Sequence, residues 1–130
     1  VELNPTQFTT HFRKAGILRA MGREQEALER ARKALACDPG NAAGHEFVAQ
    51  LYVGLGYWGE AAQAYERLIE LRPAAADLWM ALGVARMRHG ALDSATMAIN
   101  RADSLGAGNR RMLGRIRAEL GRRKAAANGN

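Results

Sequence analysis

Apolar residues recur along this chain at intervals of three and four residues, the spacing that gathers side chains on one face of an α-helix. Val48, Ala49 and Tyr52 form one such stripe, and Ala61 and Tyr65 begin the next. Short polar or glycine-containing turns interrupt the pattern. It predicts helices at about 8–21, 24–37, 42–55, 58–71, 76–89, 92–105 and 110–123.

Turn residues predict where these helices end. Gly22 is placed to end the first helix in the left-handed conformation that only glycine adopts at low cost, and Thr6 is a candidate N-cap for that helix. The turn at 38–41 contains Pro39, which lacks the amide hydrogen that a helix requires. Asn41 follows and is placed to cap the next helix.

A period of 34 residues runs through the chain. A shift by this period aligns Gly22, Gly56 and Gly90, then Ala27, Ala61 and Ala95, then Pro5, Pro39 and Pro73. Ala15, Ala49 and Gly83 also fall in register, and these small residues are expected where two helices approach closely. A fixed period of this length is typical of tandem structural repeats.

The residues at the repeated positions resemble those of tetratricopeptide repeat proteins. The third repeat matches the opening of the family pattern with Trp79, Leu82 and Gly83, and the second matches its remainder with Tyr52, Ala61, Tyr65 and Pro73. The first repeat is degenerate, with His11, Lys14, Ala15 and Leu18 at the positions of Trp, Leu, Gly and Tyr. The resemblance implies an all-α fold: an α-solenoid, or right-handed superhelix, of three tandem helix-turn-helix repeats followed by a C-terminal capping helix.

We expect a single domain over residues 1–130, because each repeat buries its surface only against its neighbours. Residues 3–5 align with the ends of complete repeats, so the chain is expected to begin on the tail of a further repeat and to be a fragment of a longer protein. The predicted parts are 1–7 (tail of a preceding repeat), 8–41, 42–75 and 76–109 (repeats), 110–124 (capping helix) and 125–130 (frayed tail).

Composition adds little to this prediction. No apolar run approaches the roughly 18 residues that span a bilayer, and no signal peptide is visible, so we expect a soluble protein, cytoplasmic or periplasmic. The single cysteine, Cys37, cannot form an internal disulfide and is interpreted as a small packing residue.

Charge is concentrated at one end of the chain. Residues 110–124 hold seven basic side chains and one acidic side chain, whereas the repeats carry equal numbers of both signs. We interpret the basic segment as a solvated cap. Nucleic acid is a weaker alternative because no aromatic residue accompanies the arginines for base stacking, and docking on an acidic partner or membrane surface stays open.

The sequence contains no catalytic motif, and neither an enzymatic activity nor a cofactor is expected. His11 and His45 occupy equivalent positions in successive repeats, about 10 Å apart, whereas zinc ligands converge within about 2.1 Å of one ion. No metal site is therefore predicted, and these histidines are expected to replace the packing tryptophan found at Trp79.

The resemblance also implies a groove lined by the first helix of each repeat, which receives an extended or helical peptide. The groove positions, transferred one at a time, are Phe12, Arg19, Glu46, Gln50, Val53, Met80, Val84, Met87 and Arg88, together with Gly16 and Asp77. Adaptable methionines suit a binding surface, but Met80 and Met87 would equally fill gaps between repeats. One subset of the family clamps the C-terminal carboxylate of chaperones; here Phe12, Gly16, Phe47, Asp77 and Ala81 replace that clamp.

The predicted function is protein recognition by a scaffold or adaptor that binds a peptide or helix of a partner protein. Two alternatives remain: a non-catalytic arm of a larger enzyme such as a transferase, and a self-associating assembly domain that forms a homo-oligomer. Bacterial secretion chaperones and assembly factors share the repeat number, which is an analogy of fold alone.

Overall fold

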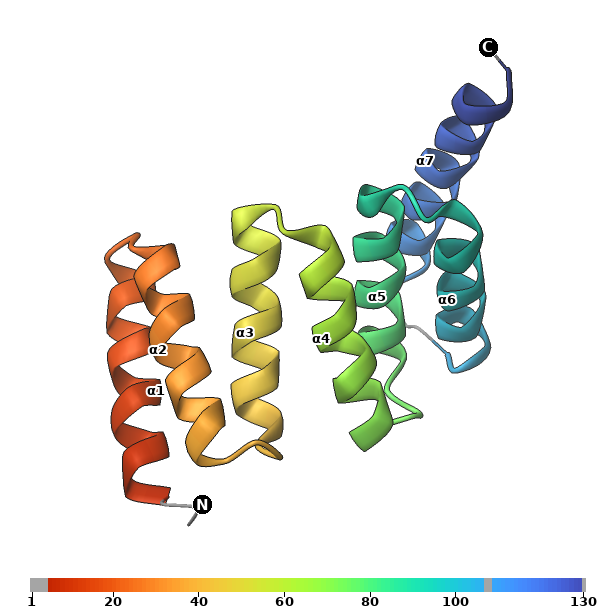
Figure 1. The fold of residues 1–130 in the computed structure, drawn as a ribbon. Helices are drawn as coiled ribbons and strands as arrows, with labels where there is room; N and C mark the ends of the chain where they lie inside the picture. The colour runs from red at the N-terminus through yellow and green to blue at the C-terminus, as the bar shows by residue number, and fades with distance from the viewer. Residues whose placement is uncertain (1–4, 107–108, 130) are drawn as a thin grey trace. The chain divides into compact units, whose positions relative to one another are not determined.

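A computed structural model describes residues 5–106 and 109–129, and the described residues are almost entirely helical (Figure 1). The helices are α1 (Pro5–Ala20), α2 (Glu24–Cys37), α3 (Ala42–Leu55), α4 (Trp58–Leu71), α5 (Ala76–His89), α6 (Leu92–Ser104) and α7 (Arg110–Gly129). Helices α2 to α5 have the bounds that the hydrophobic pattern predicts, and α6 ends one residue earlier.

The two terminal helices differ from the prediction. Helix α1 begins at Pro5, so Thr6 lies inside the helix and is not its N-cap. Proline is favourable in a first helical turn, where its missing amide hydrogen has no partner to lose. Helix α7 continues beyond the predicted end at residue 123 to Gly129. The added part includes three alanines at 125–127, and alanine has the highest helix propensity of all residues. Of the predicted tail of a preceding repeat at 1–7, residues 1–4 lie outside the described residues, and residues 5–7 belong to α1.

The turns follow the predicted chemistry. Gly22, Gly56 and Gly90 have φ values of 79°, 77° and 94°, the left-handed conformation that ends a helix at glycine. The Asn41 side chain accepts a hydrogen bond from the Gly44 amide at 3.0 Å and caps α3. Asn109 caps α7 in the same way, because its Oδ1 accepts from the Met112 amide at 2.9 Å.

The chain divides into two compact units, residues 1–64 and 65–130, with the boundary inside α4. In the N-terminal unit, α2 packs against both α1 and α3. Ala15 and Ala27 are fully buried, as expected for small residues between closely spaced helices. A Cβ atom added to Gly44 would lie 2.8 Å from Leu35 Cδ2 and 3.2 Å from Phe8 Cε2, so α3 approaches its neighbours closely at this glycine.

In the C-terminal unit, α6 packs against both α5 and α7. Gly83 lies so close to Ile99 that an added Cβ would overlap the Ile99 Cδ1 and Cγ1 atoms. Ile99 is also buried, with Met80, Ala102 and Leu113, in a cluster that joins the three helices of this unit. Among the described residues, no helix combines the length and hydrophobicity needed to span a bilayer.

Candidate functional site

The inner surfaces of α1 and α3 meet through aromatic and polar contacts in the N-terminal unit. The Phe12 and Phe47 ring centroids are 5.1 Å apart, and Phe8 stacks on Phe12 at 5.4 Å. The Arg19 guanidinium lies 5.4 Å from the Phe47 centroid and donates a hydrogen bond to Gln50 Oε1 at 2.9 Å. Three of the predicted groove residues, Phe12, Arg19 and Gln50, therefore belong to one connected surface.

Phe47 joins this surface, although it is not one of the groove positions predicted from the sequence. The 34-residue period makes Glu46, and not Phe47, equivalent to Phe12. Transferring the groove positions by this period therefore selected Glu46, the neighbouring residue. Glu46 and Val53 are half-buried on the same helix. Their spacing of four and three residues from Gln50 puts all three side chains on one face of α3.

The predicted groove residues of the C-terminal unit behave differently. Met87 is 1% exposed and packs with Ala95 and Leu120, while Met80 is 8% exposed and packs with Ile99 and Leu113. The prediction that these methionines form a binding surface is wrong because side chains of α6 and α7 cover them. Val84, between them on α5, is half-buried, and Arg88 is exposed.

Basic side chains of α7 bind acidic groups of α6. Asp103 accepts hydrogen bonds from Arg110 at 2.6 Å and from Arg117 at 3.1 Å. The Arg117 hydrogen bond, assisted by the charge of Arg110, holds the pKa of the Asp103 carboxyl below its usual value, although partial desolvation opposes the shift. Lys124 lies 3.9 Å from Asp93. Some of the basic side chains of α7 thus attach this helix to α6 through ion pairs.

The histidines have distinct environments. His45 is buried, and its Nε2 donates to the Pro39 carbonyl at 2.6 Å. The Nδ1 of His11 lies 3.5 Å from the Arg30 guanidinium. Partial burial, and then the charges of Arg30, Lys14 and Lys33, lower the pKa of His11. The described residues contain no group of three or more His, Cys, Asp or Glu side chains that could hold a metal ion.

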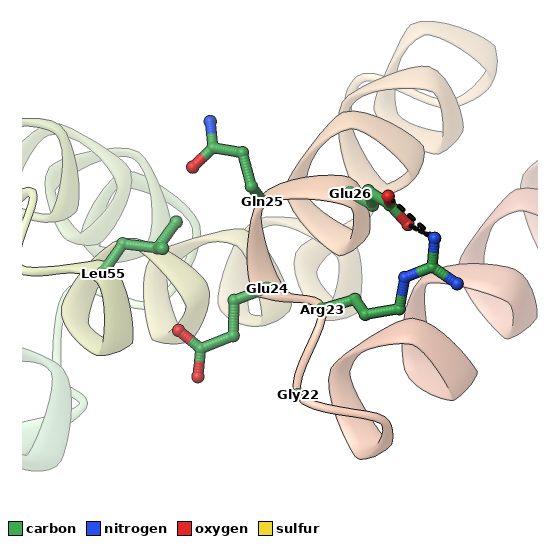
Figure 2. Close-up of a pocket in the computed structure, with 6 residues that line it drawn as sticks. All are labelled: Gly22, Arg23, Glu24, Gln25, Glu26 and Leu55. Carbon is green, nitrogen blue, oxygen red and sulfur yellow. Dashed lines mark hydrogen bonds and ion pairs between the residues drawn. The ribbon is translucent and has the colours of Figure 1, made fainter.

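Two shallow cavities border α2. The first, of about 350 Å³, lies at the turn between α1 and α2 and reaches Leu55 of α3 (Figure 2). Figure 2 shows the ion pair between Arg23 and Glu26, at 2.7 Å, among its lining residues, together with the polar side chains of Glu24 and Gln25. The second, of about 410 Å³, lies along α1 and α2. Its lining residues are Leu18, Arg23, Glu26, Glu29, Arg30 and Lys33.

The repeated antiparallel helix pairs, with a glycine turn inside each pair, define an all-α helical-repeat protein of the solenoid class. The family model described as tetratricopeptide repeat matches residues 49–110. Tetratricopeptide repeat protein 33 of Xenopus laevis is 35% identical over 86 residues, which make up 66% of this chain and 32% of that protein. The match thus spans about a third of that relative. The chain is thus similar to tetratricopeptide repeat proteins in sequence as well as in fold.

Solved structures agree with this fold. The first tetratricopeptide repeat domain of human RPAP3 superposes with a TM-score of 0.77 at 20% identity, over 98% of this chain and 100% of that one. The first such domain of Spaghetti (RPAP3), determined with the HSP90 peptide SRMEEVD bound, gives a TM-score of 0.75 at 19% identity over 98% of both chains.

Proposed function

We propose that this chain is a non-catalytic protein-interaction module that binds a peptide or helical segment of a partner protein. The main contact surface would be that formed by Phe12, Arg19, Phe47 and Gln50 in the N-terminal unit. The observation that carries the proposal is the connection of these side chains, from two different helices, into one partly exposed surface. Glu46, Val53, Val84 and Arg88 are proposed as further contacts.

The chemistry of this surface suggests the kind of peptide that binds. The phenylalanine rings offer apolar area, and aromatic side chains contribute strongly to interface energies. Arg19 lies over the Phe47 ring while one of its nitrogens donates to Gln50, so its remaining N–H groups are available to a carboxylate or carbonyl oxygen. An apolar side chain followed by an acidic or carbonyl group matches this arrangement.

The peptide is proposed to differ from the HSP90 peptide SRMEEVD bound by Spaghetti. The clamp positions hold Phe12, Gly16, Phe47, Asp77 and Ala81 in this chain, and none of these side chains is a cation. A C-terminal carboxylate would therefore lack the fixed positive partners that charge-assisted hydrogen bonds require. We also propose the repeat boundaries 8–41, 42–75 and 76–109 as the units of this recognition domain.

Self-association is a second candidate, favoured by two exposed apolar residues at the C-terminal end of α1 and in the turn that follows it. Ile17 and Met21 are 61% and 60% exposed, and their spacing of four residues places them on one face. Leu51 and Ala85, which are equivalent to Ile17 in the next two repeats, are each 1% exposed. Sedimentation over a range of concentrations tests this candidate. A concentration-dependent mass that Ile17→Glu abolishes would support a homo-oligomer.

Site-specific photocrosslinking tests the proposed peptide surface. One photoreactive residue replaces Gln50, and a matched control replaces Gln63, an exposed glutamine on α4. We expect a partner to be captured from position 50 alone, with capture reduced by Arg19→Glu. Equal capture at both positions, or capture that ignores the charge at residue 19, would reject this surface.

A further inference from the structure

The first repeat carries basic side chains where the other two repeats carry buried apolar ones. Lys14 is equivalent to Val48 and Leu82, which are 5% and 1% exposed. Arg30 is equivalent to Ala64 and Ala98, which are also buried. In the first repeat Lys14 is exposed and Arg30 is half-buried, so both side chains reach solvent.

These basic groups converge from two helices. His11 and Lys14 lie one turn apart on α1, and Arg30 and Lys33 lie one turn apart on α2. The His11 ring is 3.5 Å from the Arg30 guanidinium, which places the two pairs side by side. Lys14, Arg30 and Lys33 form no ion pair with any side chain in the part of the chain that the structure describes.

The neighbouring space is open, and three of its six lining residues are basic and two are acidic. The cavity of about 410 Å³ includes Arg30 and Lys33 in its lining, together with Leu18, which is one turn beyond Lys14 on α1. Of its two acidic residues, Glu26 is paired with Arg23 at 2.7 Å. Glu29 is the remaining carboxylate. Among the described residues, Arg30 and Lys33, both on α2, are the lining cations that form no ion pair, and Lys14 lies one turn from Leu18 on α1. Cations that converge on an open cavity can bind an anion with several oxygens.

We propose that Lys14, Arg30 and Lys33, beside His11, form a binding site for a phosphoryl group between α1 and α2. The phosphoryl dianion matches several converging cations better than a single carboxylate, because its oxygens accept from donors on both helices at once. Partial burial, and then the charges of Arg30, Lys14 and Lys33, lower the pKa of His11, so these cations lie near the ring. The site is independent of the peptide surface on α1 and α3.

The test uses the three histidines as reporters in NMR spectra of the whole chain, recorded over a range of pH around 7. Inorganic phosphate is added while the concentration of sodium chloride is lowered, so that the ionic strength stays constant. We expect a saturable shift of the His11 ring signals and a rise of the His11 pKa, because a bound anion favours the imidazolium. His45 and His89 serve as internal controls and should not follow the titration.

Variants make the test specific. Lys14→Leu and Arg30→Ala introduce the residues that the third repeat already holds at these positions, so both variants retain a fold that circular dichroism can verify. Each is expected to weaken phosphate binding by about tenfold, the effect of losing one charge-assisted contact. Arg67→Gln removes the cation equivalent to Lys33 in the second repeat and should have no effect. Glu29→Gln should strengthen binding.

O-phosphoserine identifies the source of the phosphoryl group. Tighter binding of O-phosphoserine than of phosphate would indicate a phosphorylated side chain of a partner, whereas equal binding would indicate the free anion. The proposal is overturned if neither compound shifts His11 saturably, or if Arg67→Gln weakens binding as much as Lys14→Leu does.

Discussion

At the scale of single residues, one hydrogen bond explains how different side chains occupy equivalent positions. Trp79 Nε1 donates to the Pro73 carbonyl at 2.8 Å, and His45 Nε2 donates to the Pro39 carbonyl at 2.6 Å. In both repeats the acceptor is the proline six residues earlier. The expectation that His45 replaces the packing tryptophan is therefore confirmed, and the shared feature is a ring N–H that ties the first helix of the repeat to the preceding turn.

We predict that His45→Phe lowers the free energy of unfolding by about 1 kcal/mol, because the ring is kept but its N–H donor is lost. His45→Trp keeps a ring N–H donor on a larger ring. It should lower the free energy of unfolding less than His45→Phe does. Urea denaturation followed by circular dichroism measures both. Equal stability of the phenylalanine variant and the parent would show that the hydrogen bond contributes nothing.

A second prediction concerns the contact between Gly83 and Ile99. Gly83→Leu should lower the free energy of unfolding by roughly 1–3 kcal/mol, because an overpacked side chain must displace Ile99. Gly121→Leu is the control. Gly121 is also helical, but an added Cβ meets nothing within 4 Å, so the better helix propensity of leucine should leave stability unchanged or increased. A tolerated leucine at position 83 would contradict the close approach of α5 and α6.

At the scale of helices, the hydrophobic period and the turn residues were sufficient to predict most helix boundaries from the sequence. Four helices have the predicted bounds because glycine and proline act locally, within a few residues of where they stand. For Met80 and Met87 the sequence left two alternatives open, a binding surface and the filling of gaps between repeats, and these local signals could not decide between them. Whether a methionine on α5 is exposed depends on which distant helix covers it, and neither the period nor the family register specifies where α7 lies.

The attachment of α7 to α6 predicts a pH dependence. The pKa of Asp103 is lower in the folded protein than in the unfolded chain, so its contribution to stability is present above the unfolded pKa, which is about 3.9, and is lost as the pH falls through the folded value. Arg117→Gln should raise the Asp103 pKa toward the unfolded value and remove this dependence. NMR titration of the Asp103 carboxyl measures the shift. An unchanged pKa would mean that Arg110 alone sustains the interaction.

At the scale of the whole molecule, the proposed recognition surface is distributed unevenly among the repeats. The N-terminal unit presents Phe12, Arg19 and Gln50 as a connected surface, whereas the methionines of the C-terminal unit are covered by other helices. The sequence predicted that the repeats contribute equally to the recognition surface, because each repeat has residues at the same groove positions. Partner selectivity is therefore expected to depend more on the first two repeats than on the third.

This asymmetry predicts how charge substitutions separate binding from folding. Arg19→Glu changes an exposed side chain and should weaken partner binding by at least about tenfold, since it reverses a charge at the proposed surface, while the melting temperature stays unchanged. Val84→Glu, at a half-buried position of α5, should have a smaller effect on binding.

Met87→Glu should unfold the C-terminal unit, because an unpaired carboxylate cannot be accommodated beside Ala95 and Leu120. Calorimetry and a binding assay on the same three variants provide the measurement. If Met87→Glu folded normally and alone lost the partner, the methionine surface would be the true binding site and the N-terminal assignment would be wrong.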